Sequence, residues 1–400
     1  MTIAVVGAGP AGLAIALMLA RQRRRVVVFE RFDAPRPIGA GFMLQPTGLD
    51  VLDGLGLTDA IAALGQPVHR LFGREARRGR IVLDVRYDAL NRPRPALGVL
   101  RSALFQTLYD ACLAEGIDFQ PSHEIVSADD GRPVDADGRD LGRFDLVIDA
   151  SGARSRIARD LPARGPFGAR RDLAWGAVWT TTPWPTGAGF DDSALEQTYR
   201  AADRMIGVLP SGRRPGETTP TATFFWSLKA DDHARWKAEG LDAWKAEVLS
   251  LWPRTAPVLD AITDPEALTL ARYGHHTLHR PVGPRLAVIG DAAHSTSPQL
   301  GQGVNMALLD AQALATALER SRDLDTALAA YARARRLHLA LYQALSLAFT
   351  PFYQADGRIL PWVRDHILGH VARAPMADRL LAATVSGLLL DPRRTPREPA

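Results

Sequence analysis

The first thirty residues constrain the fold of this chain more than any other stretch. An apolar run at residues 3–6 leads into a glycine-rich turn, Gly7-Ala8-Gly9-Pro10-Ala11-Gly12, and a helix-forming run continues to residue 21. A second apolar run, residues 26–29, ends at Glu30. Glycines at these spacings between a strand and a helix, with an acidic residue at the tip of the next strand, are typical of a dinucleotide-binding βαβ unit. We therefore expect a tight turn that lets a pyrophosphate approach the backbone, with Glu30 bound to the adenosine ribose.

A second stretch, residues 285–311, repeats the pattern of strand, loop and helix. The apolar run 286–289 predicts a buried strand that ends at Gly290 and Asp291, and a helix-forming run starts at Val304. Pro298 and the glycines of the loop shape a turn that leaves backbone N–H groups at the mouth of this helix, where negative charge is attracted. Alone, the stretch is compatible with a generic strand, loop and helix in which Asp291 is a cap. Taken together with the N-terminal fingerprint, this stretch favours a ligand-binding loop.

Together these stretches resemble the para-hydroxybenzoate hydroxylase-like (group A) FAD-dependent aromatic monooxygenases. The GD motif of that family is an apolar strand, Gly-Asp and then Pro-x-x-Gly-Gln-Gly-x-Asn, matched here by Gly290, Asp291, Pro298, Gly301, Gln302, Gly303 and Asn305. A third segment, residues 145–156, resembles the DG motif, which serves both flavin and pyridine-nucleotide binding. It departs from that motif because Ser151 stands where an aspartate is expected, and Ala158 where an arginine is expected.

The resemblance implies an α/β architecture of the glutathione reductase-like FAD fold. A Rossmann-type FAD-binding domain is expected to be interrupted by a β-sheet substrate domain and followed by a helical C-terminal region. The expected FAD-binding domain comprises residues 1–70, 98–169 and 268–335. The expected substrate domain comprises residues 71–97 and 170–267, with strand-like runs near 81–85, 173–181, 205–209 and 221–228 and one or two helices at 233–252. The expected C-terminal region comprises residues 336–400.

The resemblance also implies which residues contact FAD. They lie in the glycine-rich loops, in the segment beside the flavin ring and at the start of the helix after residue 100: Gly7, Gly9, Ala11, Gly12, Glu30, Arg31, Gly41, Arg101, Asp291, Pro298, Gly301, Gly303, Val304 and Asn305. Glycine at position 41 would permit close approach of the backbone to a flat ligand. Without the resemblance, Arg101 would be an ordinary first-turn arginine.

The implied chemistry belongs mainly to the cofactor. NADH or NADPH is expected to reduce the flavin, O2 to add at its C4a position, and the resulting hydroperoxide to hydroxylate a small or polycyclic aromatic substrate. The chain is thus expected to be a single-component monooxygenase that needs no protein nucleophile and no metal. The candidate pocket residues are Trp175, Trp226, Tyr273, His275 and Pro298. The tryptophans are equally compatible with a packed core, and the histidine with ordinary packing.

Composition narrows the class of protein further. A single cysteine, Cys112, excludes an intramolecular disulfide and a cysteine-based metal site, which fits the cytoplasm. The net charge is +4 and the pI about 9.4, yet the basic residues form no single patch, so nucleic-acid binding is not expected. No apolar run reaches the roughly 18 to 20 residues of a transmembrane helix. The apolar stretches 337–352 and 380–390 are suited to capping the core, to a homodimer face or to a membrane surface.

Two alternative functions share the same motifs. A membrane-associated quinone-biosynthesis hydroxylase would use the apolar C-terminal helices at a lipid surface. A flavoprotein oxidase, or a non-catalytic flavoprotein, could be built on the same fold, and the latter is suggested by Ser151 and Ala158. The sequence does not name the substrate or choose between NADH and NADPH.

Overall fold

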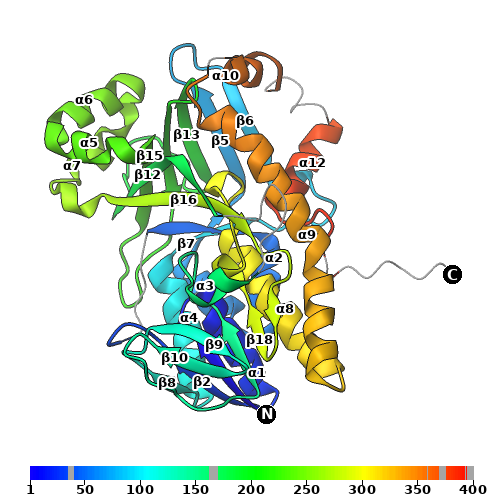
Figure 1. The fold of residues 1–400 in the computed structure, drawn as a ribbon. Helices are drawn as coiled ribbons and strands as arrows, with labels where there is room; N and C mark the ends of the chain where they lie inside the picture. The colour runs from blue at the N-terminus through cyan, green and yellow to red at the C-terminus, as the bar shows by residue number, and fades with distance from the viewer. Residues whose placement is uncertain (35–39, 162–169, 358, 369–374, 392, 394–400) are drawn as a thin grey trace.

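A computed structural model describes residues 1–34, 40–161, 170–357, 359–368, 375–391 and 393 (Figure 1). Two sheets organise these residues, one above the other in the view of Figure 1. The N-terminal residues and the GD motif lie in the lower part, and most of the residues between 170 and 277 lie in the upper part. The expected α/β fold, with an FAD-type domain and a second sheet, is confirmed.

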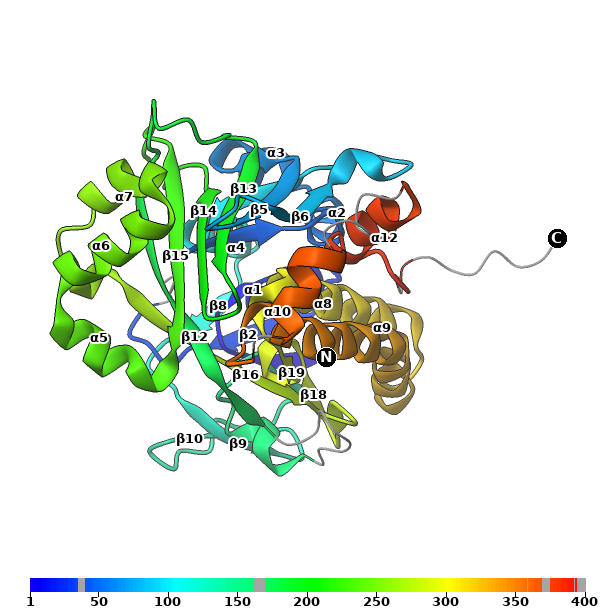
Figure 2. The same cartoon turned by 90° about the horizontal axis from the view of Figure 1, so that it is seen from above.

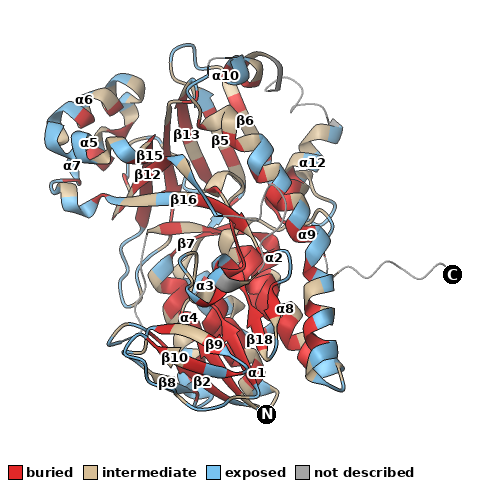
Figure 3. Ribbon diagram, viewed as in Figure 1, coloured by how far each residue is buried: buried red, intermediate tan, exposed pale blue. Residues whose placement is uncertain are grey.

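The lower sheet has the strand order β17-β18-β11-β1-β2-β8, and its five strands from β18 to β8 are parallel. Its strands are β17 (Val282–Gly283), β18 (Leu286–Val288), β11 (Leu146–Asp149), β1 (Thr2–Val6), β2 (Arg25–Phe29) and β8 (Asp118–Gln120). Among the helices that share its main apolar core are α1 (Pro10–Arg21), α4 (Arg101–Ala114) and α8 (Gly303–Arg320). The edge strand β8 is only partly buried, whereas β1, β2, β11 and β18 are almost wholly buried, and Figure 3 shows α8 as largely buried on its inner side. Short apolar strands of this kind are typical of parallel sheets that are covered on both faces. A hairpin of β9 (Ile125–Asp129) and β10 (Arg132–Asp135) lies beside this sheet.

The upper sheet has eight strands in the order β19-β16-β12-β15-β14-β13-β5-β6. They are β5 (Arg70–Glu75), β6 (Ile81–Arg86), β12 (Arg171–Pro183), β13 (Ala194–Arg200), β14 (Arg204–Pro210), β15 (Thr221–Lys229), β16 (Thr269–Thr277) and β19 (His294–Ser295). The strands expected near 81–85, 173–181, 205–209 and 221–228 are therefore present. The strand β16 extends this sheet by pairing with β12 beyond the expected boundary at 268, and the chain next enters the lower sheet at β17, which begins at Val282.

Helices cover the upper sheet on both faces. The helices α5 (His233–Glu239), α6 (Leu241–Leu251) and α7 (Ala256–Asp260) lie on one side, and α9 (Leu324–Tyr353) and α10 (Ile359–Val363) on the other, as Figure 2 shows. On the side of α5 to α7, Phe224, Trp226, Trp244 and Val248 form one apolar cluster. Trp226 is 1% exposed within this cluster and meets Trp244 edge to face. The structure therefore places Trp226 in the core, away from both cavities described below.

Smaller elements connect the two sheets. The strands β3 (Gly41–Leu44), β7 (Ala96–Leu100) and β4 (Gln66–Val68) form a three-stranded sheet. The helices α2 (Pro46–Gly54) and α3 (Thr58–Leu64) follow β3 in the chain. The long helix α9 begins at Leu324, earlier than the expected C-terminal region, and runs past both sheets in Figure 1. Near the end of the described chain, α12 (Pro375–Val385) packs against the side of β6.

Candidate active site

A cavity of about 310 Å3 opens where β1, β2 and β11 end. Nine of the residues expected to contact the cofactor line it: Gly7, Gly9, Ala11, Glu30, Arg31, Arg101, Asp291, Gly303 and Val304. Two helices, α1 at Pro10 and α8 at Gly303, begin at this cavity. Because the N-terminus of a helix presents unpaired N–H groups and partial positive charge, the cavity suits an anion such as a diphosphate.

The three fingerprint glycines meet different requirements. Gly7 has a φ of +99°, and a β-carbon there would lie 2.8 Å from the carbonyl oxygen of Ala150. A β-carbon at Gly12 would lie 1.9 Å from the carbonyl oxygen of Gly7, so this position is required for packing of the turn itself. A β-carbon at Gly9 would meet no protein atom within 4 Å. Gly9 therefore faces open space in which a phosphate group can lie.

The carboxylate of Glu30 is held at the tip of β2. Its side chain is buried, and its two oxygens accept hydrogen bonds from the backbone N–H groups of Ala8, at 2.8 Å, and Phe32, at 3.2 Å. A carboxylate has about four acceptor directions, so acceptor capacity remains for ribose hydroxyls. The cradle of glycines, the fixed carboxylate and the two helix N-termini fit the adenosine diphosphate part of FAD.

The segments that are expected beside the flavin ring are joined by Asn305. This side chain is fully buried, and its Oδ1 accepts a hydrogen bond of 2.9 Å from the backbone N–H of Gln45. Its Nδ2 donates to the carbonyl oxygen of Gly301 at 3.0 Å. Pro298, Gly301 and Asn305 do not line the smaller cavity, and the first two lie in the loop before α8. Asn305 thus ties the loop at residues 298–305 to the segment at residues 43–45.

Gly41 contacts the upper sheet. Its N–H donates to Thr223 Oγ1 at 3.0 Å, and Ser211 Oγ donates to the same oxygen at 2.7 Å. A β-carbon at Gly41 would lie 2.3 Å from Thr223 Oγ1, so this glycine is required for close packing of β3 on the sheet. Sequence reasoning missed Thr223 and Ser211, because neither lies in a recognisable motif.

The DG segment is organised around Asp149, which is fully buried. Its Oδ1 accepts hydrogen bonds from the N–H of Ser151, at 3.0 Å, and from Ser151 Oγ, at 2.6 Å, while Ser155 Oγ donates to its Oδ2. Burial raises the pKa of Asp149, and the serine donors oppose that shift. Ser151 therefore supplies two donors at a place where a second carboxylate would add like charge.

A larger cavity of about 730 Å3 adjoins the first, since Arg154 and Ser155 line both. Four arginines line it, Arg154, Arg159, Arg170 and Arg272, together with a single carboxylate, that of Asp172. Arg170 is paired with Asp172 at 3.0 Å. Within the described ranges neither Arg154 nor Arg159 forms an ion pair, and both are exposed. The larger cavity therefore carries positive charge that a ligand can meet.

Of the candidate pocket residues, Tyr273 lines the larger cavity. Its hydroxyl oxygen accepts a hydrogen bond of 2.9 Å from Trp179 Nε1, which leaves the phenolic O–H available as a donor. Burial raises the pKa of Tyr273, so the phenol stays protonated. Trp175 lies on the same sheet face as Trp179, but neither Trp175 nor Pro298 lines either cavity. His275 is buried beside Gln343, and burial lowers its pKa.

A buried charge network holds the turn that follows β18. Asp310 of α8 is fully buried and accepts hydrogen bonds from Gly290 N at 2.8 Å, His294 Nε2 at 2.6 Å and Arg335 Nε at 2.7 Å. Burial opposes its charge, but His294 and Arg335 outweigh this effect and lower the pKa of Asp310 to about 2. Gly290 has a φ of +61° and precedes Asp291, which lines the smaller cavity. The network therefore fixes the position of Asp291 at the smaller cavity, and no sequence motif points to this network.

His338 extends this network and predicts a pH dependence of stability. Arg335 donates to His338 Nδ1 at 3.0 Å, and His338 Nε2 donates to the carbonyl oxygen of Gly387 at 3.0 Å. Burial and the charge of Arg335 lower the pKa of His338 to about 4, below its ordinary value near 6.5. The unfolded chain therefore binds a proton between pH 6.5 and 4 that the folded chain does not, so stability falls as the pH drops through this window.

We expect this residue to account for up to about 3 kcal/mol of stability lost between pH 7 and pH 4. The variant His338→Gln keeps a donor and an acceptor but does not titrate. Urea unfolding of parent and variant at several pH values measures the difference. Parallel curves for the two proteins would contradict the prediction.

Comparisons with known proteins find relatives that match most of this chain. A probable 2-heptyl-3-hydroxy-4(1H)-quinolone synthase of Rhodococcus erythropolis is 28% identical over 377 residues, covering 92% of this chain and 91% of that protein. A kynurenine 3-monooxygenase of Salinispora tropica is 29% identical over 407 residues, covering 95% and 84%. The crystal structure of HpxO of Klebsiella pneumoniae, complexed with FAD and uric acid, superposes with a TM-score of 0.80 at 21% identity over 97% of each chain.

The glycine cradle, the carboxylate at the tip of β2 and the paired helix N-termini are those of a Rossmann-type dinucleotide-binding protein. A family model described as FAD binding domain matches residues 1–341, and the chain belongs to this family. The expected membership among FAD-dependent aromatic monooxygenases is confirmed, because relatives across most of the chain are named as monooxygenases or hydroxylases. In the part of the chain that the structure describes, no helix combines the length and the apolarity needed to cross a bilayer.

Proposed function

We propose that this FAD-dependent monooxygenase takes electrons from NADH or NADPH and inserts one oxygen atom of O2 into a flat aromatic or heteroaromatic substrate. The observation that carries the proposal is the pair of adjoining cavities. The smaller one fits the adenosine diphosphate of FAD, and the larger one is open, rich in arginine and lined by the phenol of Tyr273. The related proteins that act on kynurenine, urate and 3-amino-4-hydroxybenzoate support a substrate with a planar ring.

When bound, FAD supplies the redox chemistry, accepting a hydride from the nicotinamide and reacting with O2. The chain's own residues bind and orient it. N–H groups at the starts of α1 and α8 hold the diphosphate, and the α8 terminus offsets negative charge near the ring. Asp310 holds the turn that carries Asp291. The contact of Gly41 with Thr223 joins the segment beside the ring to the upper sheet. These contacts fix the site before the reaction.

Arginines of the larger cavity would hold the pyridine nucleotide, since guanidinium groups bind phosphate in bidentate fashion. We expect Arg159→Gln to raise the KM for NADH or NADPH by roughly tenfold, which corresponds to about 1.4 kcal/mol. Arg159 lines the larger cavity but not the smaller one, so FAD content is expected to stay unchanged. Anaerobic stopped-flow reduction of the flavin at varied nucleotide concentration measures the effect.

The matched control is Arg143→Gln, which removes an exposed arginine paired with Asp130 in another part of the chain. This control is expected to leave flavin reduction as in the parent. If flavin reduction in Arg159→Gln depended on nucleotide concentration as it does in the parent, the larger cavity would not be the nucleotide-binding site.

Isotope labelling tests the proposed reaction. The purified chain is incubated with NADH or NADPH, 18O2 and planar compounds that include kynurenine, urate, aminohydroxybenzoates and alkylquinolones. We expect one compound to accelerate flavin reduction and to gain a single labelled oxygen atom, because reduction without a bound acceptor would consume NADH or NADPH without forming a product. A product that has lost two hydrogens and carries no label would assign the chain to the oxidases or dehydrogenases instead.

A further inference from the structure

The end of α12 is a helix terminus whose carbonyl groups are bonded by side chains from distant parts of the chain. The last four carbonyls of a helix have no partner within the helix and need donors from elsewhere. Here Gly387, with a φ of +81°, ends the helix in the left-handed conformation, and the N–H of Leu388 bonds to the carbonyl of Ala383 at 3.0 Å. Glycine is favoured at this position because a side chain strains the conformation. We call residues 384–391 the C-terminal turn.

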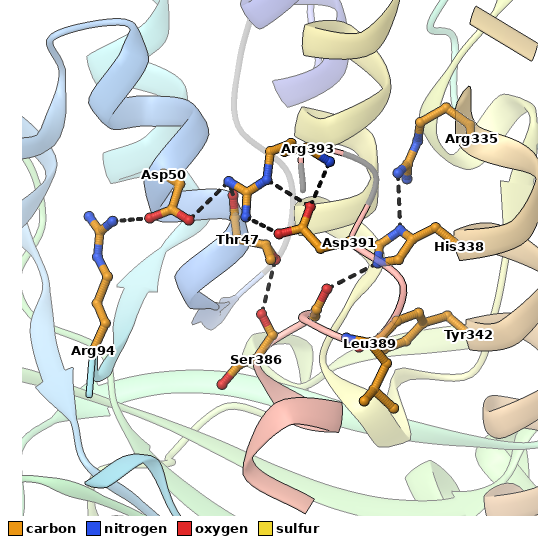
Figure 4. Close-up of polar contacts among 11 residues, drawn as sticks. Thr47, Asp50, Arg94, Arg335, His338, Tyr342, Ser386, Leu389, Asp391 and Arg393 are labelled. Atoms are coloured by element: carbon orange, nitrogen blue, oxygen red, sulfur yellow. Dashed lines mark hydrogen bonds and ion pairs between the residues drawn. The ribbon is translucent and has the colours of Figure 1, made fainter. Parts of the chain in front are cut away.

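Four consecutive carbonyl oxygens of the C-terminal turn accept hydrogen bonds from four different side chains. Tyr342 Oη donates to Thr384 at 2.9 Å, and Gln302 Nε2 donates to Val385 at 2.5 Å. Thr47 Oγ1 donates to Ser386 at 3.1 Å, and His338 Nε2 donates to Gly387 at 3.0 Å. Figure 4 shows the contacts of Thr47 and His338 approaching the turn from opposite sides. Helix α9, helix α2 and the loop before α8 therefore meet at one point.

Two of these donors, Thr47 and Gln302, adjoin or lie in the segments expected beside the flavin ring. Thr47 lies in the first turn of α2, two residues after Gln45, whose N–H is bound by Asn305. Gln302 directly precedes α8 and is 2% exposed. A β-carbon at Gly387 would lie 2.4 Å from Thr47 Oγ1 and 3.1 Å from Gln302 Oε1. Gly387 thus fills the space between the two segments and leaves no room for a larger residue.

An ion-pair chain fastens the other end of the turn to α2. Arg393 forms two hydrogen bonds with the carboxylate of Asp391, at 2.9 and 2.7 Å, and contacts Asp50 at 2.9 Å. Asp50 is also paired with Arg94, and Arg393 donates to the carbonyl oxygen of Thr47 at 3.3 Å. Figure 4 shows this chain running from Arg94 through Asp50 to Asp391. The turn is therefore held on the α2 side by both neutral and charged contacts.

We propose that the C-terminal turn is a positioning element of the flavin site, which sets the affinity for FAD by holding Thr47 and Gln302. The turn lies beyond residue 341, where the match to the FAD binding domain family ends. If a loop must be ordered before a ligand binds, the apparent affinity is the intrinsic affinity multiplied by the fraction of molecules in which the loop is ordered. Because Asn305 joins the two segments to each other, loosening either one moves both. Coupling of this kind is reciprocal, so bound FAD also stabilises the turn.

Paired substitutions at Thr47 test the proposal. Thr47→Val removes the hydroxyl that donates to Ser386 but keeps the shape of the side chain, whereas Thr47→Ser keeps the donor. We expect the FAD dissociation constant of Thr47→Val to rise by about fivefold, the effect of one hydrogen bond, with a shifted visible spectrum of the bound flavin. Thr47→Ser is expected to match the parent. Gly387→Ala, which intrudes on Thr47 and Gln302, is expected to weaken FAD binding further.

Hydrogen exchange supplies a measurement that a purely structural role would not change. Adding FAD to the parent apoprotein is expected to slow amide exchange in peptides spanning residues 384–391. The inference rests on the proposed placement of the flavin ring, so the parent is titrated first. A parent that binds no FAD would refute the cofactor assignment itself. A parent that binds FAD, with Thr47→Val and Gly387→Ala equal to it in affinity and spectrum and with exchange unaffected by FAD, would refute the coupling.

Discussion

Replacing Gly9 with valine is expected to weaken FAD binding by about a hundredfold or more while the protein remains folded. The β-carbon of the variant points into open space, since no protein atom lies within 4 Å of it, and the backbone at Gly9 has an ordinary φ of −78°. The valine methyl groups would occupy the place where the diphosphate meets the N–H groups of α1. Loss of two or three charge-assisted hydrogen bonds corresponds to roughly 3 kcal/mol or more, about a hundredfold in Kd. Flavin fluorescence titration measures the affinity, and circular dichroism with thermal unfolding of the apoproteins shows that the fold is kept.

The neighbouring glycine provides the opposite control. Gly12→Val places a β-carbon 1.9 Å from the carbonyl oxygen of Gly7, so it is expected to destabilise the apoprotein itself. Gly54→Ala, at a helix position with open space around it, is expected to change neither property. A Gly9→Val protein that keeps a full complement of FAD would show that this loop does not hold the diphosphate.

The fingerprint glycines and Glu30 are predictable from sequence because their roles are local. Gly7 has a φ of +99° and Gly12 packs against Gly7, so both requirements arise within the strand–turn–helix unit, and Gly9 faces the open space in which we propose that the ligand lies. Glu30 likewise follows from its place at the tip of β2. The same local logic predicts four strands of the upper sheet, β6, β12, β14 and β15, since their alternation is visible within a few residues.

Trp226 shows the limit of prediction from local sequence patterns. Alternation correctly groups Phe224 with Trp226 on one face of β15, but a period of two does not say which face meets helices. The helices α5 to α7 cover that face, so Trp226 is core, while Phe225 and Trp179 pack together on the other face. The place of β16 in the sheet also could not be predicted from local sequence, because it depends on pairing with β12, almost a hundred residues earlier.

Ser151 illustrates a departure from a motif that sequence alone could not interpret. The missing aspartate suggested a non-catalytic flavoprotein as one alternative. In the structure Ser151 gives two hydrogen bonds to Asp149, so the substitution has a definite partner in the fold. This partner, Asp149, is buried, and neither its burial nor the direction of its side chain can be predicted from the sequence.

Removing the carboxylate of Asp310 is expected to have the largest effect on stability of any single substitution considered. Asp310→Leu would leave the guanidinium of Arg335, which is fully buried, without its charge partner, and would strip Gly290 N of its acceptor. Breaking a buried ion pair in this way costs about 3 to 5 kcal/mol. Urea unfolding followed by fluorescence measures the loss. Asp325→Ala, an exposed aspartate of α9, serves as the control and is expected to behave as the parent.

A double variant separates the unpaired charge from lost packing. In Asp310→Leu combined with Arg335→Met, the buried guanidinium is removed together with the carboxylate, and apolar side chains fill their place, while His294 loses its acceptor in both variants. The double variant is expected to be more stable than Asp310→Leu alone by at least about 1 kcal/mol, because the guanidinium is no longer buried without a partner. FAD affinity is expected to stay below that of the parent in both variants, since the turn that carries Asp291 loses its acceptor either way. If the double variant were less stable than the single one, Arg335 would have to be stabilised by its contacts with His338 and Met306 rather than by Asp310.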